Sequence, residues 1–144
     1  MDTQRFVEFI TKNWFWCSAW FLITILLIQD MYDLLTRKHK TVTPAKAVAL
    51  LNDENTVVID VREPHEFAKG HIENARLISI GKIDEKLYEL EPHKDKPILV
   101  ICQQGTRSAH ACKKLNKAGF SQVYELSGGM LAWEDQKLPI SKKK

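Results

Sequence analysis

The chain has 144 residues, of which 44% are hydrophobic and 27% charged, with a formal net charge of +3. This length accommodates one domain of ordinary size and a short additional segment. So small a net charge gives no support for nucleic-acid binding. The three cysteines, Cys17, Cys102 and Cys112, have neither a disulfide framework nor metal-ligand spacing. We therefore expect no metal and no cofactor, and a reducing compartment suits these thiols.

A long apolar segment lies near the N-terminus. Residues 13–29 carry no charged side chain, and as a helix they would be about 25 Å long, near the lower limit for crossing a bilayer. Trp14 and Trp16 at one end and Tyr32 beyond the other are placed as interfacial anchors. No small-residue cleavage site follows, which disfavours a secretory signal peptide. A buried core helix is the other alternative, but so small a chain offers it little partner surface. We expect one transmembrane anchor helix over residues 13–35.

The segment after the apolar residues is basic. Arg37, Lys38 and Lys40 lie in it, and both attraction to anionic lipid headgroups and a plain solvated tether stay open. His39 has no ligand spacing, and we assign it no role. Basic residues flank the apolar segment with only a weak excess on the C-terminal side. Because a reactive thiol suits the reducing side, we expect a single-pass protein of the cell inner membrane with its soluble domain in the cytoplasm.

The soluble domain alternates helix and strand patterns. Thr43 is a good N-cap residue and Pro44 a good first helical residue. Apolar, β-branched runs predict buried strands at 57–60 and 98–101. Further expected elements are a short helix from Pro64 to Phe67, a strand at 75–79, helices at 83–90 and around 109–115, a strand at 122–126, and a last helix capped by Ser127 that contains Met130, Leu131 and Trp133. This alternation predicts an α/β fold with a mainly parallel central sheet covered on both faces.

The candidate site begins where the strand at 98–101 ends. Cys102 follows this strand, and a stripe of Ala109, Cys112 and Leu115 then indicates a helix, closed near Gly119. Cys102 is thus predicted at a helix N-terminus, where unpaired N–H groups favour a thiolate. The competing interpretation is a buried structural cysteine, the commoner fate of a free cysteine.

The spacing within the loop adds to the prediction. Gly105 allows a tight turn, and Arg107 supplies a permanent charge and a planar set of donors for an anion. The pattern C-x4-R is one residue shorter than the C-x5-R loop of cysteine phosphatases, which disfavours hydrolysis of phosphate esters. These residues favour a nucleophilic cysteine that attacks an anionic donor.

The segment Cys102–Arg107 resembles the active-site loop of single-domain rhodaneses, a sulfurtransferase family. Two further motifs are similar to the family's signatures: upstream, Asp60–Glu63, Glu66–Phe67, Gly70–Ile72 and Ala75; downstream, Ser127–Gly129 and Trp133. The resemblance covers about residues 42–139 and implies a three-layer domain with a mainly parallel central sheet. The expected organisation is an N-terminal segment (1–12), the anchor (13–35), a basic linker (36–42), the rhodanese-like domain (43–139) and a lysine-rich tail (140–144).

The resemblance also implies a reaction in two steps. Cys102 takes the outer sulfur from a donor such as thiosulfate, and the persulfide passes it to cyanide, a cellular thiol or an acceptor protein. The loop residues Gln103, Gln104, Gly105, Thr106 and Arg107 would bind the donor and stabilise the persulfide. Because neither glutamine is charged, the identity of the donor stays open.

Other residues receive supporting or structural roles. Asp60 and Arg62 are candidate supporting residues, expected mainly to form an ion pair at the turn after their strand. Structural roles are expected for Glu63, Glu66, His71, Cys112 and Trp133. A second class of function, a membrane-tethered binding or scaffolding module with little turnover, stays open, because the anchor suggests a partner protein at the membrane.

Overall fold

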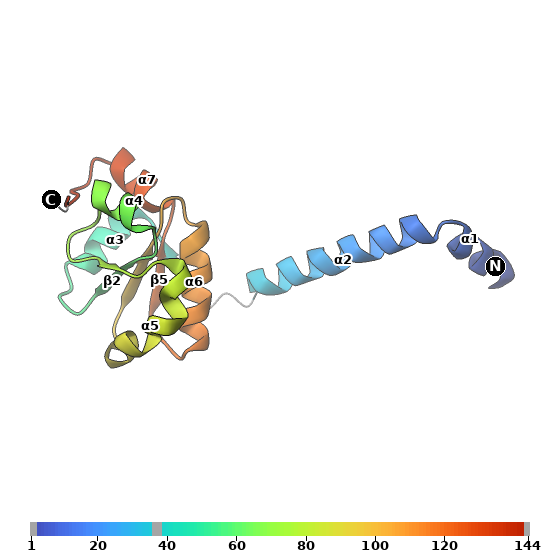
Figure 1. The fold of residues 1–144 in the computed structure, drawn as a ribbon, viewed down its shortest axis with the longest axis horizontal. Coiled ribbons are helices and arrows are strands. Elements are labelled where there is room, and N and C mark those ends of the chain that lie inside the picture. The colour runs from blue at the N-terminus through green and yellow to red at the C-terminus, as the bar shows by residue number, and fades with distance from the viewer. Residues whose placement is uncertain (1–2, 36–38, 143–144) are drawn as a thin grey trace. The chain divides into compact units, whose positions relative to one another are not determined.

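The computed structural model describes residues 3–35 and 39–142 (Figure 1). Contacts divide the chain into two units, Met1–Arg37 and Lys38–Lys144, which are described separately.

Two helices make up the described part of the first unit, α1 (Thr3–Lys12) and α2 (Trp14–Leu35). Large apolar side chains of α2 are exposed: Trp14, Phe15, Trp16, Trp20, Phe21, Leu22, Ile23, Ile25, Leu26, Leu27, Ile28, Met31 and Tyr32. Within residues 3–35 and 39–142, no helix has the length and apolarity needed to cross a membrane. The apolar part of α2 ends at Ile28, before Gln29 and Asp30, whereas a span needs about 20 apolar residues. The transmembrane helix predicted over residues 13–35 is therefore not supported.

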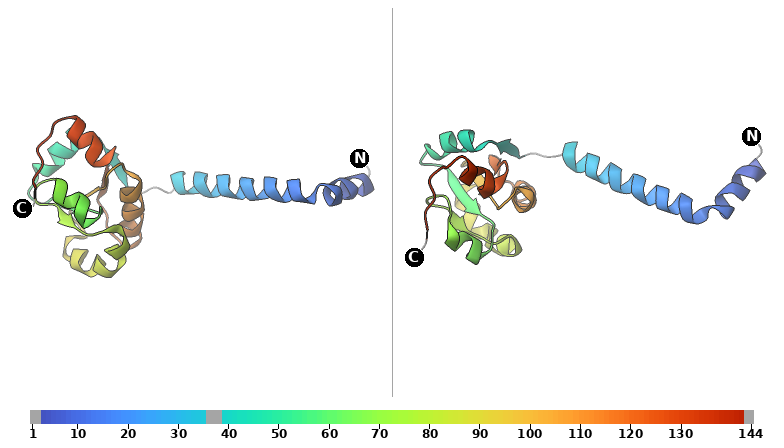
Figure 2. Two further views of the ribbon diagram at one scale, coloured as in Figure 1. Left: turned by 45° about the horizontal axis from the view of Figure 1, so that its top comes forward. Right: turned by 90° about the horizontal axis from the view of Figure 1, so that it is seen from above.

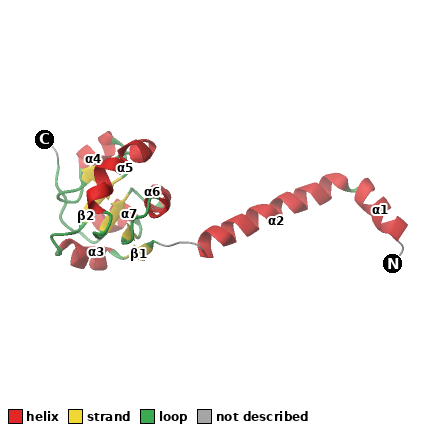
Figure 3. Ribbon diagram, turned by 90° about the horizontal axis from the view of Figure 1, so that it is seen from below, coloured by secondary structure: helices red, strands yellow, loops and turns green. Residues whose placement is uncertain are grey.

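The second unit is built on a parallel sheet of five strands in the order β1-β5-β4-β2-β3. The strands are β1 (Lys40–Val42), β2 (Val57–Asp60), β3 (Arg76–Leu77), β4 (Ile98–Ile101) and β5 (Val123–Leu126). The helices are α3 (Pro44–Leu51), α4 (Pro64–Lys69), α5 (Ile83–Leu90), α6 (Thr106–Lys117) and α7 (Gly129–Asp135), with short 3₁₀ turns at Ile80–Lys82 and Glu91–His93. Figures 2 and 3 show the helices arranged around the strands.

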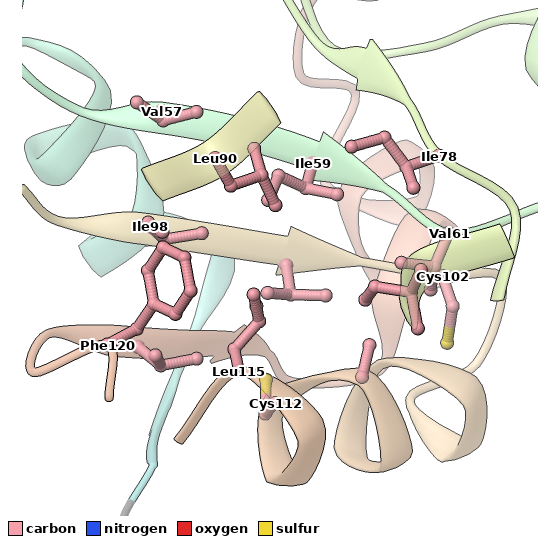
Figure 4. Packing of buried hydrophobic residues seen from close by; sticks show 14 residues of the cluster. Val57, Ile59, Val61, Ile78, Leu90, Ile98, Cys102, Cys112, Leu115 and Phe120 are labelled. Atoms are coloured by element: carbon pink, nitrogen blue, oxygen red, sulfur yellow. The ribbon is translucent and has the colours of Figure 1, made fainter. Parts of the chain in front are cut away.

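The sheet is covered on both faces, so alternate residues of its central strands enter different clusters. In β4, Ile98 and Val100 join a cluster with α5 and α6, whereas Leu99 and Ile101 join a second cluster with α3 and α7. Figure 4 shows the first cluster, in which Cys112 and Leu115 of α6 lie below β4. The predicted α/β fold with a parallel central sheet is confirmed.

Several boundaries differ from those expected. Residues 40–42, assigned to the linker, form β1, because they pair with residues 124–126 of β5. The strand expected at 75–79 is reduced to β3. Thr43 occupies the N-cap position of α3 but makes no capping hydrogen bond through its side chain. The last helix starts at Gly129 with Gly128 at its N-cap, so the capping role expected of Ser127 is wrong.

Candidate active site

Cys102 lies directly after β4, at the start of the loop that leads into α6. Its side chain is buried, and its Sγ accepts a hydrogen bond of 2.9 Å from the Gly105 N–H. Ser108, in the first turn of α6, places its Oγ 3.4 Å from the same sulfur. Gly105 has a φ of 114°, a conformation that a residue with a β-carbon adopts only with strain. The strand, loop and helix expected over residues 98–115 are thus the ones observed, with a backbone donor directed at the sulfur.

The start of α7 supports this loop from the other side. The Met130 N–H donates to the Cys102 carbonyl at 2.8 Å, and the Leu131 N–H donates to the Gln103 carbonyl at 3.2 Å. Gly129 has a φ of 59°, and a β-carbon at this position would overlap the carbonyl groups of Cys102 and Gln103. The Ser127–Gly129 motif therefore contains a glycine that permits α7 to approach the cysteine loop closely.

Asp60 and Arg62 form a buried ion pair beside the loop. Arg62 Nη2 lies 2.7 Å from Asp60 Oδ2 and also donates to the Gly70 carbonyl at 2.7 Å. Arg62 Nη1 donates to Gln103 Oε1 at 3.1 Å. The ion pair expected from the sequence is present, and it also holds a side chain of the cysteine loop.

Arg107 is bound by Glu66 of α4. Its two terminal nitrogens donate to the two oxygens of Glu66, each at 2.7 Å. Hydrogen bonding to Arg107 is the main cause that lowers the pKa of Glu66 to about 2, and the same contact raises the pKa of Arg107. The sequence suggested a merely structural role for Glu66. Its carboxylate instead binds both terminal nitrogens of Arg107, which were predicted to hold an anionic donor.

The remaining loop residues lie at its outer side. Gln104 and Thr106 are exposed, and Gln103 is half-buried. Uncharged side chains therefore form the outer part of the loop.

Three residues that contact the sulfur or one another were not predicted from the sequence: Ser108, Glu125 and His39. Glu125 lies in β5 and is 7% exposed. The Ser108 hydroxyl lies 3.0 Å from Glu125 Oε1, and His39 Nε2 lies 3.1 Å from Glu125 Oε2. A carboxylate within the apolar strand 123–126 is a signal in itself, because buried charges need partners. The sequence gives no sign that the partner is His39.

Three of the residues expected to be structural, namely His71, Trp133 and Cys112, occupy structural positions. His71 stacks on Phe67 with ring centroids 3.9 Å apart, and its Nδ1 lies 3.0 Å from the Phe67 carbonyl. Trp133 is buried and donates to the Pro139 carbonyl at 3.0 Å. Burial, and then the charge of Glu125, raises the pKa of the Cys112 thiol, which makes Cys112 a poor nucleophile. Among the described residues, no group of three or more histidine, cysteine or acidic side chains could hold a metal ion.

The second unit matches a known protein family over most of its length. A family model described as the rhodanese-like domain matches residues 43–136. The chain belongs to the rhodanese-like family. It is 33% identical over 138 residues to the uncharacterized protein YibN of Escherichia coli, covering 95% of this chain and 96% of YibN. Similarity to GlpE of Pseudoalteromonas translucida, named a thiosulfate sulfurtransferase, is 34% identity over 95 residues, covering 66% and 89% of the two chains.

A solved structure agrees with this assignment. The rhodanese-related protein of Thermoplasma volcanium superposes with a TM-score of 0.66 at 31% identity, covering 73% of this chain and 100% of that one. The family expected from the three sequence motifs is therefore confirmed.

The approach of α7 to the loop generates a first prediction. Gly129→Ala should slow alkylation of Cys102 by iodoacetamide about tenfold or more, because the added methyl group displaces the Cys102 and Gln103 carbonyls. Gly119→Ala is the matched control, since Gly119 also has a positive φ but has no atom within 4 Å of the added carbon. Urea unfolding should show that each variant loses about 1–2 kcal/mol from left-handed strain, with a further loss for Gly129→Ala. Equal alkylation rates in the two variants would contradict this account of Gly129.

The Glu66–Arg107 pair generates a second prediction. The pKa of Glu66 is lowered from 4.5 to about 2 in the folded chain. The pair therefore stabilises the fold fully above pH 4.5, and its contribution is lost as the pH falls toward 2. The difference in free energy of unfolding between the unsubstituted chain and Glu66→Gln should follow this course in urea titrations. Glu89→Gln, which alters an exposed ion pair with Lys86, is the control; a difference for Glu66→Gln that does not change over this pH range would argue against the pair.

Proposed function

We propose that this chain is a rhodanese-type sulfurtransferase that moves sulfane sulfur through a Cys102 persulfide. The observation that carries the proposal is the 2.9 Å hydrogen bond from the Gly105 N–H to the Cys102 Sγ, at the carboxyl end of β4 and the N-terminus of α6. A backbone donor fixed in this place stabilises a negative charge on sulfur without the need to reorganise. A cysteine so placed is suited to nucleophilic attack and to carrying an anionic adduct.

The first step transfers the outer sulfur of the donor. With thiosulfate, the Cys102 thiolate forms a bond to the outer sulfur, the sulfur–sulfur bond of thiosulfate breaks, and sulfite leaves with the bonding electrons. In the second step, a thiolate or cyanide attacks the terminal sulfur of the persulfide, and Cys102 leaves as a thiolate. The loop from Gln103 to Arg107 surrounds the transferred sulfur in both steps. No net oxidation occurs and no cofactor is required.

The charges around the loop bear on the choice of donor. Arg107 offers its terminal nitrogens only in competition with Glu66, which already binds both of them. Gln103 and Gln104 add no positive charge. This arrangement supports a donor that depends less on negative charge than thiosulfate does, such as a persulfide group on a small thiol or on a donor protein. Thiosulfate is still the first donor to test, because the relative GlpE is named for it.

A second candidate is a rhodanese-like binding or scaffolding module with little turnover. The specific observation in its favour is the bidentate Glu66–Arg107 pair, which leaves anionic donors to compete with a carboxylate for Arg107. The two candidates differ in whether sulfur reaches Cys102 and leaves it again.

A third prediction separates these candidates. Incubation of the full chain with thiosulfate should add the mass of one sulfur atom to the Cys102 peptide, and cyanide should then remove it with formation of thiocyanate. Cys102→Ser should abolish the adduct and the turnover, because no thiolate remains at the loop. Cys112→Ser is the matched control and should retain both. An adduct on Cys112, or none on Cys102 with any sulfane-sulfur donor, would refute the sulfurtransferase proposal.

We also propose that α2 attaches the chain to the inner membrane, with the rhodanese-like domain on the cytoplasmic side. The support is the exposed apolar surface of α2, which includes Trp16, Trp20 and Phe21. Lipid would cover this surface with aromatic and aliphatic contacts. The proposal concerns attachment and not a span. A membrane protein that supplies or accepts sulfur is a suitable partner for such a domain.

A fourth prediction tests the attachment. The full chain should bind vesicles of phosphatidylethanolamine and phosphatidylglycerol, and the double variant Leu22→Lys/Leu26→Lys should weaken binding about tenfold or more, because two charges enter one face of α2. Tyr88→Lys, at an exposed site in α5, should bind as the unsubstituted chain does.

In intact cells, a membrane-impermeant thiol reagent should label Cys102 only after lysis. Equal vesicle binding by all chains would refute attachment through α2, and labelling before lysis would place the domain on the other side.

A further inference from the structure

Three side chains that the sulfur-transfer mechanism does not use form a continuous chain of contacts to the reactive sulfur. His39 Nε2 lies 3.1 Å from Glu125 Oε2, and Glu125 Oε1 lies 3.0 Å from Ser108 Oγ. Ser108 Oγ lies 3.4 Å from Cys102 Sγ. The residues come from different elements: His39 directly precedes β1, Glu125 lies in β5, and Ser108 lies in α6. The contacts thus connect the segment that enters the domain to the cysteine loop.

The carboxylate of Glu125 affects the negative charge that the Cys102 sulfur can carry. The Glu125 side chain is 10% exposed and that of His39 is 4% exposed, so water screens their charges weakly. A buried carboxylate one hydroxyl group away from Cys102 opposes formation of a thiolate or a persulfide anion, because the charges are alike. A proton on His39 makes the pair neutral and removes this opposition.

Ser108 connects Glu125 with the sulfur through its hydroxyl group. Its hydroxyl has one proton and three acceptors within reach, namely the Gly105 carbonyl at 2.7 Å, Glu125 Oε1 at 3.0 Å and Cys102 Sγ at 3.4 Å. An ionised Glu125 without a cationic partner holds that proton more strongly. When protonated His39 balances the charge of Glu125, the Ser108 hydroxyl can donate its hydrogen bond to the anionic sulfur.

We propose that His39 is a positioning residue for the sulfur-transfer reaction, which sets the reactivity of Cys102 through Glu125 and Ser108. With His39 protonated, Glu125 is neutralised and the Ser108 hydroxyl donates to the sulfur anion. With His39 neutral, the charge of Glu125 opposes the anion. This inference rests on the proposed role of Cys102 as nucleophile, and it makes sulfur uptake sensitive to the proton on a residue at the entrance to the domain.

Other titratable groups face the same region, and the two arginines among them each have a partner of their own. Arg107 of α6 is bound to Glu66 of α4, and Arg62 is bound to Asp60 of β2. Cys112 of α6 is buried, and the charge of Glu125 contributes to raising the pKa of its thiol, so it stays uncharged. The described contacts place the basic side chain of His39 on Glu125, and its substitution should therefore change the charge balance at Cys102 selectively.

The test measures the rate of Cys102 alkylation by iodoacetamide from pH 5.5 to pH 10 in the full chain, with the modified peptides separated by mass spectrometry. His39→Gln should shift the midpoint of the profile upward by about half a pH unit or more, and slow alkylation at pH 7 about threefold or more, because Glu125 loses its charge partner. Glu125→Gln should not shift it upward. The double variant should match Glu125→Gln, since removal of the carboxylate removes the need for His39. Cys112→Ala, a core neighbour outside the chain of contacts, should keep the original profile.

The outcomes discriminate between this role and a structural one. A structural role predicts that Glu125→Gln slows alkylation and that the double variant is slower still, and either result would overturn the proposal, as would an unchanged profile for His39→Gln. His39→Lys keeps the positive charge and should retain fast alkylation at neutral pH, which provides a test if His39→Gln does not fold. Alkylation requires no sulfur donor. Failure of sulfur uptake therefore counts against the sulfurtransferase proposal, whereas an unshifted alkylation profile counts against the role of His39.

Discussion

The structure around Cys102 depends on the contact between the cysteine loop and the first turn of α7. The carbonyl groups of Cys102 and Gln103 accept hydrogen bonds from the Met130 and Leu131 N–H groups. Since the C=O and N–H of a trans peptide unit point in opposite directions, these bonds turn the N–H groups of Gln103 and Gln104 away from α7. The Gly105 N–H, which follows in the loop, donates a hydrogen bond of 2.9 Å to the Cys102 Sγ. The approach of α7 is possible because residue 129 is a glycine, with no side chain to overlap the loop carbonyls.

Charge is arranged in pairs around this loop. Asp60 with Arg62, Glu66 with Arg107, and Glu125 with His39 each join an acidic side chain to a basic one. Because the guanidinium groups are already bound to carboxylates, backbone dipoles are the groups left to stabilise a negative charge on sulfur in the proposed reaction. The pairs differ in the chemistry of their basic member, which is an arginine in two of them and a histidine in the third.

Much of the domain follows from local sequence patterns. The apolar runs at 57–59 and 98–101 lie within β2 and β4, and the spacing of Cys102, Gly105 and Arg107 correctly marks the turn into α6. The spacing could not reveal that Arg107 binds Glu66, which lies 41 residues away. Similarly, β1 depends on pairing with β5 across the chain, and His39 meets Glu125 at a separation of 86 residues. The predicted transmembrane helix rested on composition, and the apolar part of α2 is too short to support it.

We propose that the loop holds a charged sulfur at Cys102 by means of a directed backbone donor. The most direct measurement is the NMR chemical shift of the Gly105 amide proton, recorded as Cys102 is ionised by pH and then loaded with sulfur, with Cys102→Ser as the control. The account predicts a downfield shift of this proton when the sulfur becomes anionic, and no such change in Cys102→Ser, because the hydrogen bond strengthens with negative charge on the acceptor. A Gly105 amide that stays unchanged while Cys102 ionises and takes up sulfur would contradict the account.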